Sequence, residues 1–249
     1  MSNFKKFSHP RVSGEPVNVK HKLKYFFILF GFLSASAFAH DLWIEKEGAD
    51  YILFQGHRYA EHPGEEVIPY PPSAVKAWAC INEQGSYPLS SHTPVYPTRV
   101  SGECGTVHVT FSTGYWTKTP WETRNIAKAG LTGVVKSWYS QESLKFIQRW
   151  IGAAPLGTGL EITPTTNPLL LKPGDKLVVL ITNDGKPIAG VPVAYRGDTR
   201  GVSGIDGTIA IRLRQSGMQL LEASLEIPLT DGKADVAIHV ATSQFFITP

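Results

Sequence analysis

The chain has 249 residues, of which 24 are Lys or Arg and 21 are Asp or Glu. Six of the basic residues and one acidic residue lie in residues 1–39, so the rest of the chain carries a net charge of −2. Because no basic stripe remains to neutralise phosphates, this composition argues against nucleic acid as a partner.

Residues 1–39 have the features of a secretory signal peptide. Lysines at 20, 22 and 24 precede a compact apolar run over residues 25–38, and Ala37-Phe38-Ala39 supplies the small-x-small pattern of a cleavage site. The apolar run is shorter than the roughly 20 residues that a membrane-spanning helix needs. We therefore expect cleavage after Ala39 and a mature periplasmic protein that begins at His40 and has no stable membrane anchor.

The first residues of this mature chain predict a β-hairpin. LWIEKE (42–47) and YILFQG (51–56) are two strand-like runs joined by Gly48-Ala49. A two-residue loop pairs Glu47 with Asp50, and the same ladder then brings His40 opposite His57. Directly opposed residues have Cβ atoms roughly 4.5–5.5 Å apart on one face of the sheet.

Two opposed histidines at this place predict a metal site. Cleavage would free the α-amine of His40, whose pKa near 8 lets a metal cation displace its proton near neutral pH. The amine and two imidazoles would form a histidine brace, and such nitrogen donors suit nickel, zinc, iron and, with the strongest intrinsic affinity, copper. The alternative is that both histidines are exposed polar residues near strand ends.

The stretch GHRYAEHPGEE, residues 56–66, offers further candidates. His62 would complete the coordination sphere. The Asp41 carboxylate would accept a hydrogen bond from an imidazole N–H of a ligating histidine. The carboxylates of Glu61, Glu65 and Glu66 are interpreted as a solvated loop. The remaining histidines of the mature chain, His92, His108 and His239, are assigned structural roles.

Cys80 and Cys104 are the two cysteines of the chain. An even pair in an exported protein predicts a disulfide bond, and free thiols that ligate a metal are the alternative.

The mature chain is predicted to be mainly β, with two β-sandwich (Ig-like or transthyretin-like) domains and one short helix. The first domain covers residues 40–162. It includes the helix, which the spacing of Leu144, Ile147 and Ile151 predicts. The proline-containing stretch 161–175 is interpreted as a linker. Residues 163–249 form the second domain, because short alternating runs there are separated by turns such as Asn-Asp-Gly-Lys at 183–186.

Several motifs together resemble a known family. HDLWIEKEG, LFQGHRY with HPGEE, GYWTKTPWETRN, SWYSQESLKFIQRW and DGKPIAGVPVAYRGDTRG are similar to an exported domain-of-unknown-function family whose members are described as periplasmic components of nickel/cobalt uptake. The resemblance implies an accessory protein that collects Ni²⁺ or Co²⁺ and delivers it to an energy-coupling-factor-type permease. The metal-binding role that the resemblance implies applies to His40, His57 and His62. The resemblance implies no catalytic residue.

Other functions remain as alternatives. The sequence has no G-x-S-x-G, H-E-x-x-H, phosphate-loop or Cys-x-x-Cys motif, so an enzyme is not expected. A histidine brace can also support copper-dependent oxidation, which is the one enzymatic alternative. A periplasmic copper (Cu²⁺) binder and a scaffold without metal that mediates contacts at the cell surface are the other two.

Overall fold

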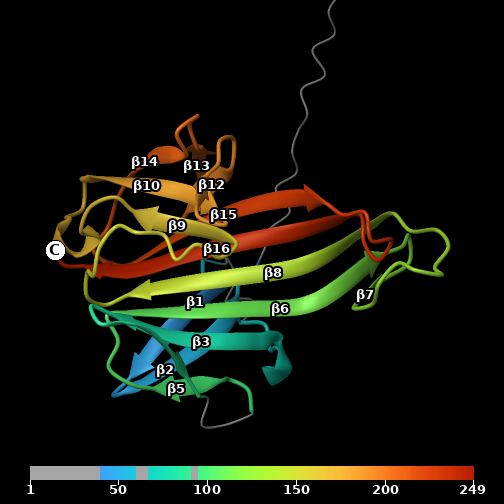
Figure 1. Cartoon of the computed structure of the whole chain (residues 1–249), viewed down its shortest axis with the longest axis horizontal. Helices are drawn as coiled ribbons and strands as arrows, with labels where there is room; N and C mark the ends of the chain where they lie inside the picture. Colours follow the sequence, from blue (N-terminus) through green and yellow to red (C-terminus); the bar gives the residue numbers. More distant parts are fainter. Residues whose placement is uncertain (1–39, 60–66, 91–94) are drawn as a thin grey trace, which may run out of the picture. The chain divides into compact units, whose positions relative to one another are not determined.

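A nine-stranded sheet runs through both halves of the chain in the computed structural model, which describes residues 40–59, 67–90 and 95–249 (Figure 1). These residues belong to one unit, Phe38–Pro249. Within the sheet, β8 and β16 run parallel side by side, and this pair joins strands from the two predicted domains. The strands in spatial order are β13 (Asp198–Val202), β12 (Pro192–Tyr195), β15 (Gly217–Pro228), β16 (Val236–Ile247), β8 (Lys136–Ile147), β6 (Thr106–Lys118), β3 (Val75–Asn82) and β4 (Gly85–Leu89), with β7 (Thr123–Arg124) beside β6.

Two smaller sheets accompany the large one. The first has three strands in the order β1 (Asp41–Glu47), β2 (Asp50–Gly56) and β5 (Arg99–Ser101). The second has four strands, β11 (Lys186–Pro187), β10 (Lys176–Asn183) and β14 (Thr208–Arg212), with β9 (Leu160–Pro164) also paired to β10. Two short 3₁₀ turns, η1 (Pro72–Ala74) and η2 (Pro168–Leu170), complete the elements that the structure describes. The predicted mainly β, sandwich-type fold is confirmed.

Each small sheet contributes to its own hydrophobic core. The first core joins β1 and β2 to β3, β6 and β8 and contains, among others, Leu42, Tyr51, Trp78, Phe111 and Leu144. The second joins β9, β10 and β14 to β12, β15 and β16 and contains, among others, Ile162, Val179, Tyr195, Leu221 and Phe245. Successive side chains of a strand point to opposite faces, so in β8 Leu144 and Phe146 lie in the first core whereas Ile147 lies in the second.

The predicted helix around residues 144–151 is wrong. Residues 136–147 form β8, and Trp150, beyond the strand, packs against the second core. The cause is burial on both faces of β8: Leu144, Lys145, Phe146 and Ile147 are all buried. A strand that is covered on both sides loses the apolar/polar alternation and cannot be distinguished from a buried helix by its pattern.

The predicted linker at 161–175 is also wrong in its first part. β9 pairs with β10 from Leu160↔Asn183 to Pro164↔Val179, and all five of its residues are buried. Among the described residues β9 pairs with β10 alone, so Pro164 lies in an edge strand, where proline is tolerated. The domain boundary at 162/163 therefore falls inside β9, and independent folding of the two halves stays a prediction.

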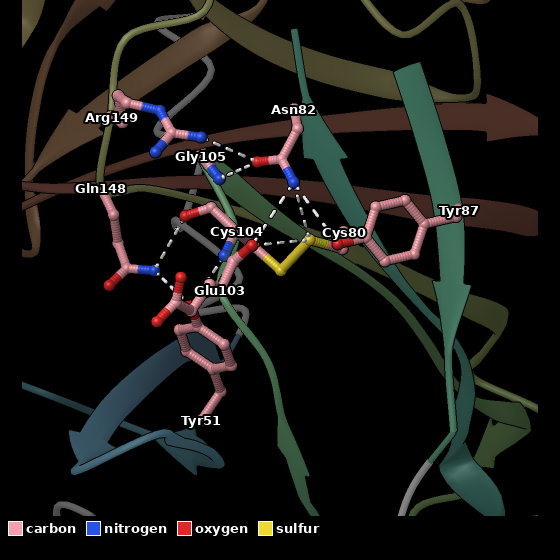
Figure 2. The surroundings of a disulfide bond; sticks show 9 residues. All are labelled: Tyr51, Cys80, Asn82, Tyr87, Glu103, Cys104, Gly105, Gln148 and Arg149. Atoms are coloured by element: carbon pink, nitrogen blue, oxygen red, sulfur yellow. Dashed lines mark hydrogen bonds between the residues drawn. A yellow bond between two sulfur atoms is a disulfide. The ribbon is translucent and has the colours of Figure 1, made fainter. Parts of the chain in front are cut away.

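The predicted disulfide bond between Cys80 and Cys104 is confirmed, with a Cα–Cα distance of 5.3 Å (Figure 2). It joins β3 to the segment that leads into β6. Beside it, the Asn82 side-chain oxygen accepts hydrogen bonds from the Gly105 N–H at 2.6 Å and from Arg149 Nη2 at 3.1 Å (Figure 2). The bond and this amide together hold the start of β6 and the segment after β8 against β3.

Among the described residues, no helix is both long enough and apolar enough to cross a membrane.

Candidate metal site at the open end of the first hairpin

The hairpin that carries the two candidate ligands has the predicted register. β1 and β2 pair from Glu47↔Asp50 at the turn to Asp41↔Gly56 at the open end, so the expected pairs Trp43↔Phe54 and Leu42↔Gln55 are confirmed. Gly48 has φ 61°, a value that glycine adopts readily, and this fits a tight two-residue turn.

His40 and His57 lie next to each other directly beyond the last pair of this ladder. Their ring centroids are 5.0 Å apart and the ring planes meet at 71°, an edge-on arrangement. Both residues are partly buried. The structure therefore brings together two of the three predicted ligands.

The local electrostatics favour the neutral form of His40. Burial lowers its pKa most, the neighbouring His57 lowers it further, and the Asp41 carboxylate raises it. A neutral imidazole has a free ring nitrogen for a metal. The third donor, the His40 amine, is a peptide nitrogen in the full-length chain and becomes available only by cleavage after Ala39.

Asp41 is buried, 8% exposed, and makes contacts away from the two rings. Its Oδ2 accepts a hydrogen bond from the Arg58 backbone N–H at 3.3 Å. Its carboxyl group also hydrogen-bonds with Glu222 of β15. The structure thus shows Asp41 fixing the segment after His57, and its predicted support of an imidazole stays a prediction.

His62 and the acids Glu61, Glu65 and Glu66 lie outside the described residues. Within residues 40–59, 67–90 and 95–249, no group of three or more His, Cys, Asp or Glu side chains is arranged to hold a metal ion. The described part of the site therefore provides two imidazoles, and further ligands would come from the freed amine and from residues or molecules beyond that part.

Two carboxyl groups beneath the hairpin, those of buried Glu142 and half-buried Glu222, were missed by the sequence analysis. Glu142 of β8 is 6% exposed, and Gln55 Nε2 lies 3.3 Å from each of its oxygens. Burial raises the pKa of Glu142 to about 7, against the hydrogen bonds from Ser140 and Gln55. Burial also raises the pKa of Glu222, as does its hydrogen bond with Asp41. These acids lie within the runs WYSQES and LLEASL, where no simple alternation marks them as buried.

Other histidines of the described chain lie away from this hairpin end. His108 is buried in β6, and burial followed by the charge of Lys145 lowers its pKa to about 4. His239 lies in β16 with its pKa lowered by burial. Neither belongs to a three-residue ligand group among the described residues, and the structural roles assigned to them stay a prediction. His92 lies outside those residues.

The hairpin, the first core and most of the second core fall within one sequence family. A family model described as "Domain of unknown function (DUF4198)" matches residues 37–227. The chain belongs to the DUF4198 family. The predicted membership of a domain-of-unknown-function family is thereby confirmed, and no curated protein matches the chain. In this DUF4198 protein the matched region contains His40, His57 and the strands from β1 to β14 together with nearly all of β15.

Proposed function

We propose that this protein is a periplasmic metal-binding accessory protein that captures Ni²⁺ or Co²⁺ and supplies the ion to a membrane uptake permease. The observation that carries the proposal is the 5.0 Å separation of the His40 and His57 rings at the N-terminus expected after cleavage. Two imidazoles and one amine are donors that nickel and cobalt accept. The resemblance to nickel/cobalt uptake components supports the choice of metal and of the permease as partner.

Copper is the second candidate metal. An amine and two imidazoles form a histidine brace, and the general order of affinities places Cu²⁺ above Ni²⁺ and Co²⁺ at the same nitrogen donors. A copper-binding periplasmic protein would use the same residues, so the donor set alone does not separate the two functions.

The test compares three forms of the protein by calorimetry with Ni²⁺, Co²⁺ and Cu²⁺ at fixed pH. They are the chain that begins at His40, the same chain with one extra N-terminal residue, and His57→Ala. The extra residue turns the His40 amine into an amide, and His57→Ala removes the opposed imidazole. Each change should weaken metal binding at least tenfold, about 1.4 kcal/mol. His239→Ala, which changes a histidine of a different strand, should leave the affinity unchanged.

Each result has a defined meaning. Equal affinity of the extended and the mature chain would exclude the amine as a ligand. If none of the three metals binds the mature chain, the metal-capture proposal is wrong and the scaffold alternative is favoured. Nitrogen donors ordinarily bind Cu²⁺ more tightly than Ni²⁺ or Co²⁺. A preference of the protein for Cu²⁺ that exceeds this ordinary difference would favour copper handling.

A further inference from the structure

The chain neighbours of both histidines contact the same pair of strands in the second half of the protein. The side chain of Asp41, the residue after His40, lies beside that of Glu222 of β15. Tyr59, two residues after His57, lies with its ring 4.5 Å from the guanidinium carbon of Arg196, which directly follows β12. β12 and β15 are paired, with Ala194 opposite Glu222.

Arg196 is itself held in place. It has φ 54°, its backbone N–H donates to the Leu220 carbonyl at 3.1 Å, and its Nη1 donates to the Met218 carbonyl at 3.5 Å. The next residue is Gly197, where an added Cβ atom would be in ordinary van der Waals contact with Tyr59 Cβ, at 3.8 Å. The turn after β12 thus lies beside Tyr59 and places a fixed cation on its ring.

The strand pairing of the hairpin ends before the two histidines. Its last ladder pair is Asp41↔Gly56, so His40 and His57 both lie beyond the paired strands. The ends of a hairpin fray unless other contacts hold them. Ligands must be kept within a fraction of an ångström of a productive geometry, and neighbouring residues supply that restraint.

We infer that the paired strands β12 and β15 position the two histidines, and that Arg196 is a positioning residue that acts on His57 through Tyr59. This inference rests on the proposed metal site and adds its positioning residues. Metal affinity depends on the contact between the hairpin and the turn after β12, because metal binding and this contact stabilise each other.

The test uses three variants of the full mature chain that begins at His40. Arg196→Gln removes the cation over Tyr59, and Arg196→Lys keeps a cation there. Arg200→Gln is the control: Arg200 is near the same turn, where its guanidinium carbon lies 5.8 Å from the centre of the Tyr195 ring and its side chain pairs with Asp198. A cation–aromatic contact of this kind has a free energy that corresponds to roughly a 3- to 10-fold change in affinity.

Two measurements are made on each variant. Calorimetry with Ni²⁺ should show a 3- to 10-fold loss for Arg196→Gln, recovery with Arg196→Lys and no change for Arg200→Gln. NMR of the histidine ring nitrogens in metal-free protein should show displaced or broadened His57 signals in Arg196→Gln alone.

The outcomes separate this inference from the proposed function. If the mature chain binds Ni²⁺ and Arg196→Gln binds it equally well, the positioning role is wrong and the metal site stands. If the mature chain binds no metal, the proposed function is wrong, and undisturbed His57 signals in Arg196→Gln would overturn the positioning role as well. A folded Arg196→Lys variant that behaves like Arg196→Gln would also overturn it.

Discussion

Gln244 of β16 closes the outer edge of β1 by bonding both backbone groups of Ile44. The Ile44 N–H donates to Gln244 Oε1 and Gln244 Nε2 donates to the Ile44 carbonyl, each at 2.8 Å. The side-chain amide therefore forms, at this one residue, the two backbone hydrogen bonds that a neighbouring strand would form. Because Gln244 is fully buried, this contact fixes the hairpin that carries His40 and His57 onto the large sheet.

Replacement of Gln244 by methionine should destabilise the protein. The variant keeps the length of the side chain and leaves the buried Ile44 N–H and carbonyl without partners, which costs about 1–3 kcal/mol. Urea unfolding should show this loss, and a Gln141→Met control at an exposed position of β8 should stay within about 0.5 kcal/mol of the parent. A Gln244→Met variant as stable as the parent would mean that water replaces the amide.

The register of the hairpin was predictable from local sequence, whereas its anchors were not. A two-residue turn and matched strands determine which residues oppose each other. Ile44 and Gln244 are 200 positions apart, and no local sequence pattern predicts a contact between residues so far apart. Asp41 with Glu222 and Tyr59 with Arg196 are equally remote in sequence. The sequence therefore predicted which histidines face each other, and the residues that hold them became visible only in the fold.

β8 shows why local pattern failed elsewhere. Its last residues are buried on both faces because the two smaller sheets lie on opposite sides of this strand. A pattern-based prediction assumes one solvent-facing side, so four consecutive buried residues were interpreted as part of a helix. The same double coverage hid Glu142 and Lys145 as buried charged groups.

The carboxyl groups of Glu142 and Glu222 under the hairpin should make stability fall as pH rises. The folded-state pKa of Glu142, about 7, and that of Glu222 are both raised above the ordinary value of 4.5. The folded protein thus keeps protons that the unfolded chain loses, so their stabilisation is complete below pH 4.5 and is lost as pH rises through the folded-state pKa values.

Glu142→Gln and Glu222→Gln test this pH dependence. An amide mimics the protonated carboxyl, so each variant should lose part of the decline in unfolding free energy between pH 5 and 8, at most about 1.4 kcal/mol per pH unit for one proton. The lowered pKa values of His40 and His108 act in the opposite direction below pH 6.5, so each variant is compared with the parent at every pH in the presence of a chelator. If the unfolding free energies of variant and parent change in parallel with pH, these carboxyl groups have the same pKa in the folded and the unfolded state.

A buried ion pair joins β8 to β9. Lys145 Nζ lies 2.6 Å from Glu161 Oε2 and also donates to Thr163 Oγ1 at 2.9 Å. Glu161 receives backbone N–H bonds from Leu156 at 2.8 Å and Thr158 at 2.9 Å. The carboxylate therefore has more remaining partners than the ammonium if the pair is broken.

The two halves of this ion pair should respond unequally to substitution. Glu161→Gln leaves a buried ammonium with a hydroxyl and neutral amide groups and should cost about 3–5 kcal/mol. Lys145→Met should cost less, because two backbone N–H groups still stabilise the carboxylate. The double variant should be more stable than Glu161→Gln alone. Denaturant unfolding of the three variants gives this ranking, and equal losses in both single variants would contradict the asymmetry.

The second core should fold without the first half, provided that β9 is included. Apart from Ile147, the buried residues of that core lie between Leu160 and Ile247. A fragment of residues 158–249 keeps them and should unfold cooperatively in urea. A fragment of residues 165–249 loses the fully buried β9 with Leu160 and Ile162 and should show no cooperative transition.

The longer fragment should also self-associate. In the full chain β16 pairs with β8 from Val236↔Trp138 to Phe245↔Ile147. Removal of β8 exposes this long row of backbone N–H and carbonyl groups, and an unpaired edge of this length binds other strands. Sedimentation should therefore show association that increases with concentration in the fragment and is absent from the mature full-length chain. If residues 158–249 lack a cooperative transition at every concentration, the two cores depend on each other and the halves fold as one domain.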